Sequence, residues 1–339
     1  MTPEDWEHLQ RIVQTGQSDE ATAAFIIDSP WLPNWFDKSI FDYYADPECW
    51  FQANLAAIQN FPKAMFLPGF WAEYGMCSEP ASFGARCSFY EDEFPFAHPV
   101  PDALNSLSQP DPRTDGLTPF ILQRLESMRP RIEAAGHHIR FAIARGPLNI
   151  ASFLMGSSEF LMALCMEPEK VQRLLDTITR FLVDWLQLQK ERIDSIDGIF
   201  ILDDIVGFIG EDDFQKFAKP RITQMFSAFD ASLRFFHNDA HGLVCAPHLA
   251  DMGVNLFNFS CDHTIEEMLQ LTGNSVTLLG NIPPRDVLAQ GTPEDVTRSV
   301  RELRQSLPDN KRVLYSCGGG MPPGVSTENI NAFLNALSE

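Results

Sequence analysis

Short apolar runs alternate with helical patterns along most of this chain. Seven runs have the length of a buried strand, and segments with helical periodicity separate most of them. They are residues 64–68, 139–144, 198–202, 233–236, 254–257, 276–279 and 312–315. Strands that alternate with helices in this way are typical of parallel strands joined by crossover helices, so the pattern predicts an α/β fold.

Two features favour a barrel over an open doubly wound sheet. No GxGxxG motif follows the first predicted strand, and about seven strand–helix units exceed the usual count for an open sheet. Nearly every apolar run also ends in a polar or glycine cluster, as at Asp203-Asp204. We therefore predict a (β/α)8 TIM barrel in residues 61–339, preceded by an N-terminal helical extension in residues 1–60 that packs on the barrel.

Helical stripes predict four of the connecting segments, at residues 1–17, 48–61, 117–135 and 171–193. Residues 70–116 are rich in proline, glycine and acidic residues and lack clear periodicity, so we expect a long excursion over the barrel mouth. A cluster of aromatic residues near the N-terminus is interpreted as a hydrophobic seal or as the surface of a homodimer. Its members are Trp31, Trp35, Phe36, Tyr43, Tyr44 and Trp50.

The charge of the chain excludes some classes of partner. With 25 Lys and Arg against 46 Asp and Glu, the formal net charge is -21, which repels nucleic acid and anionic lipid. No apolar run approaches the roughly 18 residues of a membrane span, and the N-terminal pattern is not that of a signal peptide. The 7 cysteines are odd in number and scattered without a CxxC pair, which predicts a cytoplasmic protein.

Polar residues that follow the predicted strands are the candidates for chemistry. Strand ends converge at one mouth of a barrel, so we predict that His237, Asp239, Asp203 and Asp204 meet there as catalytic residues. Imidazole and carboxylate groups can exchange protons or bind a metal ion. The structural alternatives are a hydrogen-bond network for the first two residues and a helix cap for the two adjacent aspartates.

Three further residues are expected to bind substrate, namely Glu73, Asn258 and Asn281. A surface carboxylate at Glu73 and buried backbone partners for the two amides are the alternatives. Cys317 lies in a glycine-rich turn and could reach the same centre, or it is a small buried apolar side chain.

Four segments in a fixed order carry a family resemblance. They are Arg145–Gly156 with Met166–Glu169, then Leu202–Asp204 with 214–220, then 237–239 through 249–258, and finally Gly280–Pro284 with Cys317–Gly324. Together they resemble the uroporphyrinogen decarboxylase superfamily over roughly residues 60 to 337. The resemblance implies a barrel enzyme, and Arg145 in the first segment is assigned with it to substrate binding.

The decarboxylases of this superfamily carry an early Met-Arg-Gln-Ala-Gly-Arg motif whose arginines hold substrate carboxylates. Here the corresponding residues 66–74 contain no arginine. Because paired guanidinium groups are the natural way to grip carboxylates, this difference disfavours a porphyrinogen substrate. A decarboxylase of porphyrin biosynthesis or of another acid is kept as an alternative.

The superfamily's methylcorrinoid:thiol methyltransferases bind zinc through a His-x-Cys pair and a later cysteine. In this chain the pair reads His237-Asn238-Asp239, and Gly319 takes the place of the late cysteine. The resemblance therefore implies a zinc site formed by His237, Asp239 and Cys317. It implies a methyltransferase of the O-demethylase type, which moves a methyl group from a small aryl ether or amine to a corrinoid protein. A non-catalytic ligand-binding barrel is the second alternative.

Overall fold

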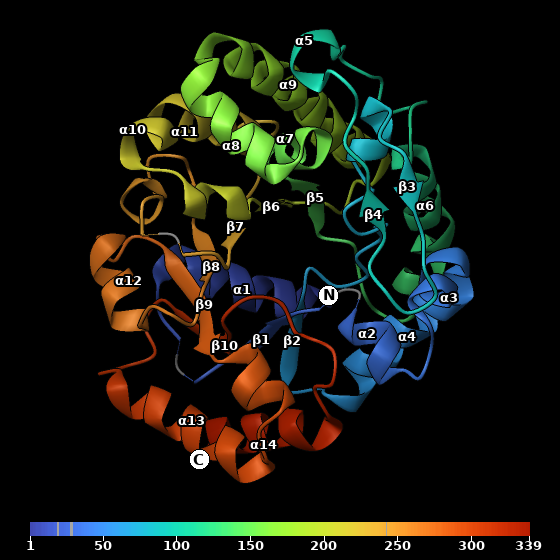
Figure 1. Cartoon of the computed structure of the whole chain (residues 1–339). Helices are drawn as coiled ribbons and strands as arrows, with labels where there is room; N and C mark the ends of the chain where they lie inside the picture. The colour runs from blue at the N-terminus through green and yellow to red at the C-terminus, as the bar shows by residue number, and fades with distance from the viewer. Residues whose placement is uncertain (19, 28–29, 242) are drawn as a thin grey trace.

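Eight parallel strands form one curled sheet with helices around it (Figure 1). The computed structural model describes residues 1–18, 20–27, 30–241 and 243–339. The strand order is β2-β1-β10-β9-β8-β7-β6-β5, so neighbours in the sheet are mostly neighbours in the chain. The strands are β1 (Ala23–Ile26), β2 (Ala64–Leu67), β5 (Phe141–Arg145), β6 (Gly198–Leu202), β7 (Leu233–Asn238), β8 (Leu256–Phe259), β9 (Thr277–Ile282) and β10 (Val313–Cys317). This arrangement confirms the predicted α/β barrel class.

The helices pack outside the sheet, and a small two-stranded hairpin, β3 (Cys87–Ser88) with β4 (Phe96–Ala97), lies next to α3. The α-helices are α1 (Pro3–Thr15), α2 (Trp31–Trp35), α3 (Ile40–Ala45), α4 (Pro47–Asn60), α5 (Ala103–Ser106), α6 (Thr118–Ala134), α7 (Pro147–Met155), α8 (Ser157–Met166), α9 (Pro168–Arg192), α10 (Glu211–Asp213), α11 (Lys219–Phe226), α12 (Ile265–Leu271), α13 (Pro293–Ser306) and α14 (Thr327–Ser338). Short 3-10 or π turns are η1 (Pro80–Phe83), η2 (Asp204–Phe208), η3 (Phe214–Ala218), η4 (Ala246–His248) and η5 (Pro284–Ala289).

Alternation along each strand separates an inner from an outer apolar cluster. On β7, Leu233 and Phe235 belong to the inner cluster, whereas Phe236 packs with the helices outside. The inner rings of Phe200 and Phe235 stack with centroids 4.3 Å apart. His237, two positions beyond Phe235, therefore also faces the barrel interior.

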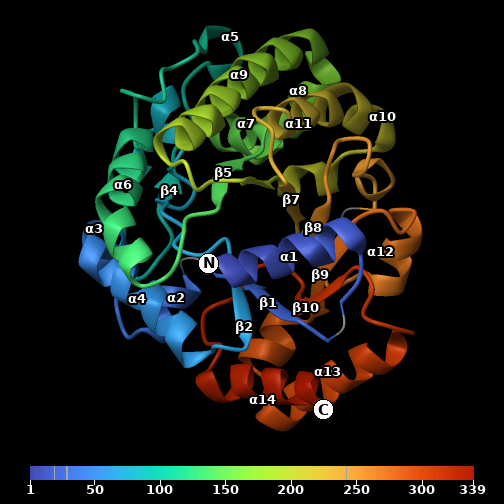
Figure 2. The same ribbon diagram turned by 180° about the vertical axis from the view of Figure 1, so that it is seen from behind.

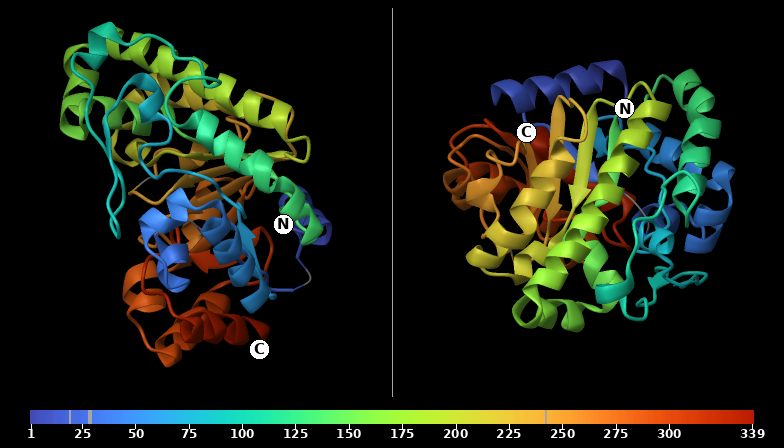
Figure 3. Two further views of the ribbon diagram at one scale, coloured as in Figure 1. Left: turned by 90° about the vertical axis from the view of Figure 1, so that its right-hand side faces the viewer. Right: turned by 90° about the horizontal axis from the view of Figure 1, so that it is seen from above.

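Helix α1 covers the barrel at the ends where the strands begin (Figure 2). Its buried residues Trp6, Leu9, Ile12 and Val13 belong to the inner cluster, and the ring of Trp6 meets Phe141, the first residue of β5, at 5.3 Å. Figure 3 (left) shows α1 on one side of the strands and the β3–β4 hairpin on the opposite side. The mouth where the strands end is therefore on the side away from α1.

The N-terminal segment differs from the predicted helical extension of residues 1–60. It supplies β1, which lies between β2 and β10 with Ala23 opposite both Ala64 and Tyr315. The barrel thus begins within residues 1–60, because the apolar run Ala23–Ile27 contains a strand that pairs with a neighbour on each side.

The N-terminal aromatic residues also take part in the packing. The rings of Trp31, Tyr43, Tyr44 and Trp50 are buried inside the molecule. They form a seal within the chain, so these four rings do not provide the exposed surface of the predicted homodimer.

The sheet has a seam between β2 and β5, where no ladder joins the two strands in the described ranges. Side chains satisfy the open edge of β5 instead. Gln189 of α9 accepts from Ile143 N and donates to Ile143 O, each at 3.0 Å, and Glu79 accepts from Arg145 N at 3.0 Å. The amide of Gln189 thus takes the place of a neighbouring strand.

In the described parts of the chain, no single helix is long and apolar enough to cross a membrane. The pair α7 and α8 reaches that length and apolar character only together, with a bend of 108° between the two helices. Most residues of α7 are buried inside the fold.

Candidate functional site

Three side chains converge at the barrel mouth from the ends of β6 and β7. Nε2 of His237 lies 3.7 Å from Oδ1 of Asp204 and 3.8 Å from Oδ2 of Asp239. One ligand atom from each of the three residues lies within 4.8 Å of the other two. His237 is 6% exposed, Asp204 is half-buried and Asp239 is exposed, so the cluster is open to the mouth on one side.

Asn258 of β8 fixes the ring of His237. Its Nδ2 donates to the carbonyl oxygens of Leu279 at 2.8 Å and Cys317 at 3.4 Å, so its Oδ1 must face His237. That oxygen lies 2.8 Å from Nδ1 of His237, which therefore carries the proton in the neutral ring. Nε2 then presents a lone pair to the two carboxylates, as a metal-ligating histidine does.

The cluster joins two carboxylates to one imidazole, and no lysine or arginine among the described residues pairs with either carboxylate. In the described ranges, His237 is the ion-pair partner found for both Asp204 and Asp239. Burial raises the pKa of Asp204, and the charge of Asp239 adds to this shift, whereas a protonated His237 would oppose it. One imidazole nitrogen and two carboxylates at this spacing are a donor set that a divalent first-row metal ion accepts. The residues present therefore fit a metal ion.

Gly319 leaves the space that the carboxylate of Asp239 occupies. A Cβ atom built on Gly319 would lie 2.7 Å from Oδ2 of Asp239, and the backbone has φ +103°. The carboxylate thus fills the region into which a longer residue at 319 would project. Gly319 is the position that the family resemblance gives to the late cysteine.

Cys317 is the third metal ligand expected from the sequence, but it is not part of the cluster of Asp204, His237 and Asp239, whose ligand atoms lie within 4.8 Å of one another. It shares the outer face of β10 with Val313 and Tyr315, and its Sγ donates to the carbonyl oxygen of Gly319 at 3.6 Å. Burial raises the pKa of its thiol to about 12. Asp204 stands in the place expected for Cys317, because strand alternation turns the cysteine away from the mouth.

Asp203 has a different environment from Asp204, although both were predicted to be catalytic. It is fully buried and accepts from Leu148 N at 2.9 Å and Asn149 N at 3.1 Å, at the start of α7. Burial raises its pKa well above the usual value, and these backbone donors oppose the shift. Gly146 is required beside it, because a Cβ there would lie 2.2 Å from Oδ2 of Asp203. Asp203 therefore anchors α7 to β6.

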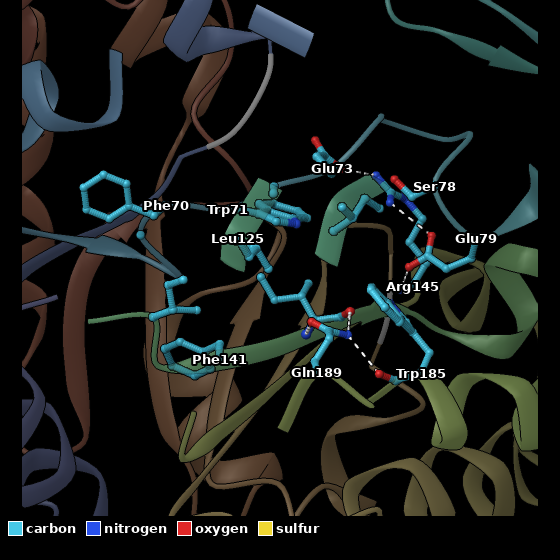
Figure 4. A pocket seen from close by; sticks show the side chains of 15 residues that line it. Phe70, Trp71, Glu73, Ser78, Glu79, Leu125, Phe141, Arg145, Trp185 and Gln189 are labelled. Carbon is cyan, nitrogen blue, oxygen red and sulfur yellow. Dashed lines mark hydrogen bonds and ion pairs between the residues drawn. The ribbon is translucent and has the colours of Figure 1, made fainter. Parts of the chain in front are cut away.

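Arg145 and Glu73, both predicted to bind substrate, bind each other (Figure 4). The guanidinium of Arg145 lies 2.7 Å from Glu73 and 3.4 Å from Glu79, and both carboxylates are buried. Burial opposes the charge of Arg145, but the two carboxylates outweigh it and raise the pKa of Arg145. The adjoining cavity at the seam has a volume of about 20 Å³, room for one water molecule. The substrate expected from the sequence does not fit there.

Asn281 bonds to the backbone rather than standing free at the mouth. Its Nδ2 donates to the carbonyl oxygen of His263, in the loop after β8. The two asparagines predicted to bind substrate are thus engaged with the protein, Asn258 with His237 and Asn281 with this loop.

Sequence reasoning treated Asp204 as catalytic and missed it as a candidate metal ligand, although a signal was present. Gly198, Phe200 and Leu202 occupy one face of β6, and Asp204 continues that face at the mouth. Asp203 continues the outer face with Ile199 and Ile201. The period of two in a strand was therefore sufficient to separate the two aspartates.

Comparisons with known proteins identify the family. The family model for uroporphyrinogen decarboxylase (URO-D) matches residues 36–339 of the chain. A uroporphyrinogen decarboxylase of Xylella fastidiosa is 21% identical over 277 residues, which are 76% of this chain and 76% of that protein. A methylated-thiol–coenzyme M methyltransferase of Methanosarcina mazei is 24% identical over 226 residues, which are 66% of this chain and 59% of that protein.

Solved structures agree with the fold. A methyltransferase from Methanosarcina mazei superposes with a TM-score of 0.82 at 18% identity, covering 97% of each chain. A B12-independent methionine synthase from Shewanella sp. W3-18-1 superposes with a TM-score of 0.56 at 12% identity, covering 93% of this chain and 96% of that one. At these identities the likeness concerns the fold alone.

Proposed function

The chain belongs to the uroporphyrinogen decarboxylase (URO-D) family, and we propose that it is a methyltransferase within this family. In this proposal it takes the methyl group of a small aryl ether or amine and passes it to a corrinoid carried by a separate protein. The mouth cluster of Asp204, His237 and Asp239 is the observation that carries the proposal. Two of its members, His237 and Asp239, are residues that the resemblance assigns to a metal site, and Asp204 is the third member instead of Cys317.

The three residues would hold a divalent ion such as zinc. When bound, such an ion acts as a Lewis acid and stabilises negative charge on the leaving heteroatom of the substrate. Asn258 keeps Nε2 of His237 free of a proton, and Asp203 holds α7 against the end of β6. Because Asp239 is exposed, a substrate and a partner protein can approach from the open side of the mouth.

Two carboxylates in place of two thiolates suit an oxygen or nitrogen leaving group better than a thiol acceptor. Thiolate ligands favour soft and borderline metal ions such as zinc, whereas carboxylates also suit harder divalent ions such as manganese. The ligand change therefore argues against the thiol chemistry named for the methyltransferase relative of Methanosarcina mazei. It favours a demethylating role for this chain.

Decarboxylation is the second candidate, because relatives such as that of Xylella fastidiosa are uroporphyrinogen decarboxylases. Two observations weigh against it. Residues 66–74 contain no arginine, and the guanidinium of Arg145 is already paired with two buried carboxylates. A substrate with many carboxylates would need free guanidinium groups at the mouth.

The test begins with metal analysis. The purified chain is stripped with a chelator, loaded with zinc, dialysed and analysed for bound metal. We expect about one zinc ion per chain, since the three ligand atoms form one cluster. His237→Ala and Asp239→Ala should each lose most of it, whereas His248→Ala, at a half-buried histidine paired with Glu211, should retain it.

The activity is measured with free cob(I)alamin and a methoxyphenol or trimethylamine as probes. Formation of methylcobalamin, followed by absorbance and lost in the His237 and Asp239 variants, is the expected result. Release of carbon dioxide from uroporphyrinogen without a corrinoid would replace this proposal with the decarboxylase. Absence of both reactions, together with absence of bound metal, would favour a non-catalytic ligand-binding barrel. A cytoplasmic location and a homodimer stay predictions.

A further inference from the structure

Two histidines from different loops meet at the rim of the barrel mouth. His241 lies two residues after Asp239, in the loop that follows β7, and His263 lies in the loop between β8 and α12. The centroids of the two rings are 4.9 Å apart, with 47° between the ring planes. Both loops begin where their strands end, so this histidine pair is on the same side of the barrel as the cluster around His237.

Contacts with two other elements hold the backbone at both histidines. The carbonyl oxygen of His263 accepts a hydrogen bond from Nδ2 of Asn281, on β9. A Cβ atom built on Gly207, in η2, would lie 2.8 Å from the carbonyl oxygen of His241, so the loop after β7 packs closely on η2. The two rings are therefore carried by backbone that the rest of the mouth holds in place.

The two nitrogens of the His263 ring have different surroundings. His263 is 6% exposed, and its Nδ1 lies 3.5 Å from Oε2 of Glu267, in the first turn of α12. A carboxylate beside Nδ1 favours the tautomer with the proton on Nδ1, as in metal-ligating histidines, and leaves a lone pair on Nε2. That Nε2 is buried and has no hydrogen-bond partner among the described residues. An unsatisfied buried polar atom is costly, so a partner for this lone pair is expected.

We propose that His241 and His263 bind a divalent metal ion of the kind that imidazole prefers, such as copper, nickel or zinc, at a second site of this chain. The proposal is independent of the proposed function, since neither histidine belongs to the cluster of Asp204, His237 and Asp239.

The spacing of the histidine pair suits one shared ion. With metal–nitrogen bonds of about 2.0–2.1 Å, two imidazoles bound at square or tetrahedral angles have centroids roughly 4.5–5.2 Å apart. The 4.9 Å between the rings of His241 and His263 falls in this range. His241 is exposed, so its ring can turn one nitrogen toward Nε2 of His263, and water completes the coordination from the open side.

Two protein ligands hold an ion less tightly than the three of the first cluster. We therefore expect dialysis to remove the ion from the histidine pair while it leaves zinc in that cluster, so the second site is found by titration. Copper(II) is a suitable probe because it binds nitrogen ligands more tightly than the other divalent first-row ions do. The nitrogen couplings in its electron paramagnetic resonance spectrum also count the imidazoles bound to it.

The experiment adds one equivalent of copper(II) to the full-length His237→Ala variant, in which the first cluster has lost its imidazole. We expect a spectrum with couplings to two nitrogen nuclei, from His241 and His263. The zinc-loaded wild-type chain should give the same two-nitrogen pattern, so the result does not depend on how the His237→Ala variant folds. A pattern with no more than one nitrogen in both proteins would overturn the proposal.

Further variants identify the source of the two nitrogens. His241→Ala and His263→Ala, each in the zinc-loaded chain, should abolish the two-nitrogen pattern and leave the zinc of the first cluster in place. His248→Ala removes a half-buried histidine that is paired with Glu211, and it should leave the pattern unchanged. A two-nitrogen pattern that survives His241→Ala would assign the copper to other histidines and sink the proposal, whereas the proposed function would stand, because it depends on the zinc of the first cluster.

Discussion

The candidate site depends on which face of a strand each residue occupies. His237 lies two residues beyond Phe235 on the inner face of β7, and Asp204 lies two beyond Leu202 on that of β6. Asp203 and Cys317 fall on outer faces, where one anchors a helix and the other packs as a small apolar side chain. A shift of one residue therefore separates a candidate metal ligand from a structural residue.

At this scale Asn258 is expected to position His237 rather than to touch substrate. Asn258→Leu removes the acceptor at Nδ1, so either ring nitrogen can carry the proton. We expect zinc affinity to fall about 10–100-fold, the usual effect of losing the partner of a ligating histidine. Competition with a chromogenic chelator measures the affinity, and nitrogen NMR of labelled histidine reports the tautomer.

Asn255→Leu is the control for that variant. The side chain of Asn255 accepts from Arg234 N and donates to Ser232 O, so it bonds only to backbone in these two contacts. It lies before β8 rather than at its end. Equal loss of zinc affinity in the two variants would contradict the positioning role.

Gly319→Ala tests the space beside Asp239. The new methyl group would lie 2.7 Å from Oδ2 of Asp239, at a backbone φ of +103°. We expect lower zinc affinity together with a strain of about 1–3 kcal/mol. Gly324→Ala carries similar strain at φ +88° with no atom within 4 Å of the new methyl group. It should lower stability by a similar amount and leave zinc affinity unchanged, and loss of zinc in both variants would contradict the steric explanation.

At the scale of elements, β5 is the last strand of the sheet, and within the described ranges no strand pairs with its outer edge. Its outer edge is satisfied by Gln189 from α9 and by Glu79. At the β2–β5 seam, side chains take the place of hydrogen bonds between strands. They leave only a small cavity there, lined in part by Trp71, Phe141 and Trp185 (Figure 4). The seam thus holds the barrel together without pairing its edge strands.

Gln189→Leu should therefore lower the free energy of unfolding by more than the loss of one side-chain hydrogen bond usually does. It leaves both the N–H and the C=O of Ile143 buried without a partner, at a cost of about 1–3 kcal/mol for each group. Urea denaturation followed by circular dichroism measures the loss. Gln187→Leu removes one bond from an exposed residue of the same helix to Ala228 O and should cost less than about 1 kcal/mol. A cost for Gln189→Leu no larger than this would mean that the edge does not need the amide.

At the scale of the whole molecule, the two ends of the barrel have separate tasks. Helix α1 fills the end where the strands begin with large apolar side chains, and polar residues collect at the other end. Figure 2 shows this helix lying across the strands. Stability and chemistry are therefore expected to respond to different substitutions.

Trp6→Ala should lower the free energy of unfolding by about 3–5 kcal/mol, because it removes a large buried ring that packs on Phe141. Zinc affinity should not change, since the ligands lie at the opposite ends of the strands. Chemical denaturation and zinc titration measure the two quantities on the same sample. Glu7→Ala, exposed on the same helix, should leave both nearly unchanged. A parallel loss of zinc affinity in Trp6→Ala would show that the two ends are coupled.

The sequence by itself determined the fold class, the family resemblance and the strand ends that carry polar residues. Seven of the eight barrel strands lie at or near the predicted apolar runs, because burial on both faces makes such runs continuous. Strand β1 was not predicted, although its apolar run Ala23–Ile27 is as long as the runs at other strands.

Only the tertiary structure decided which polar groups share a space. Local sequence fixes the face of a residue, but contacts between distant segments fix its partner. Arg145 therefore turned out to pair with Glu73 and Glu79, and Asn258 with His237.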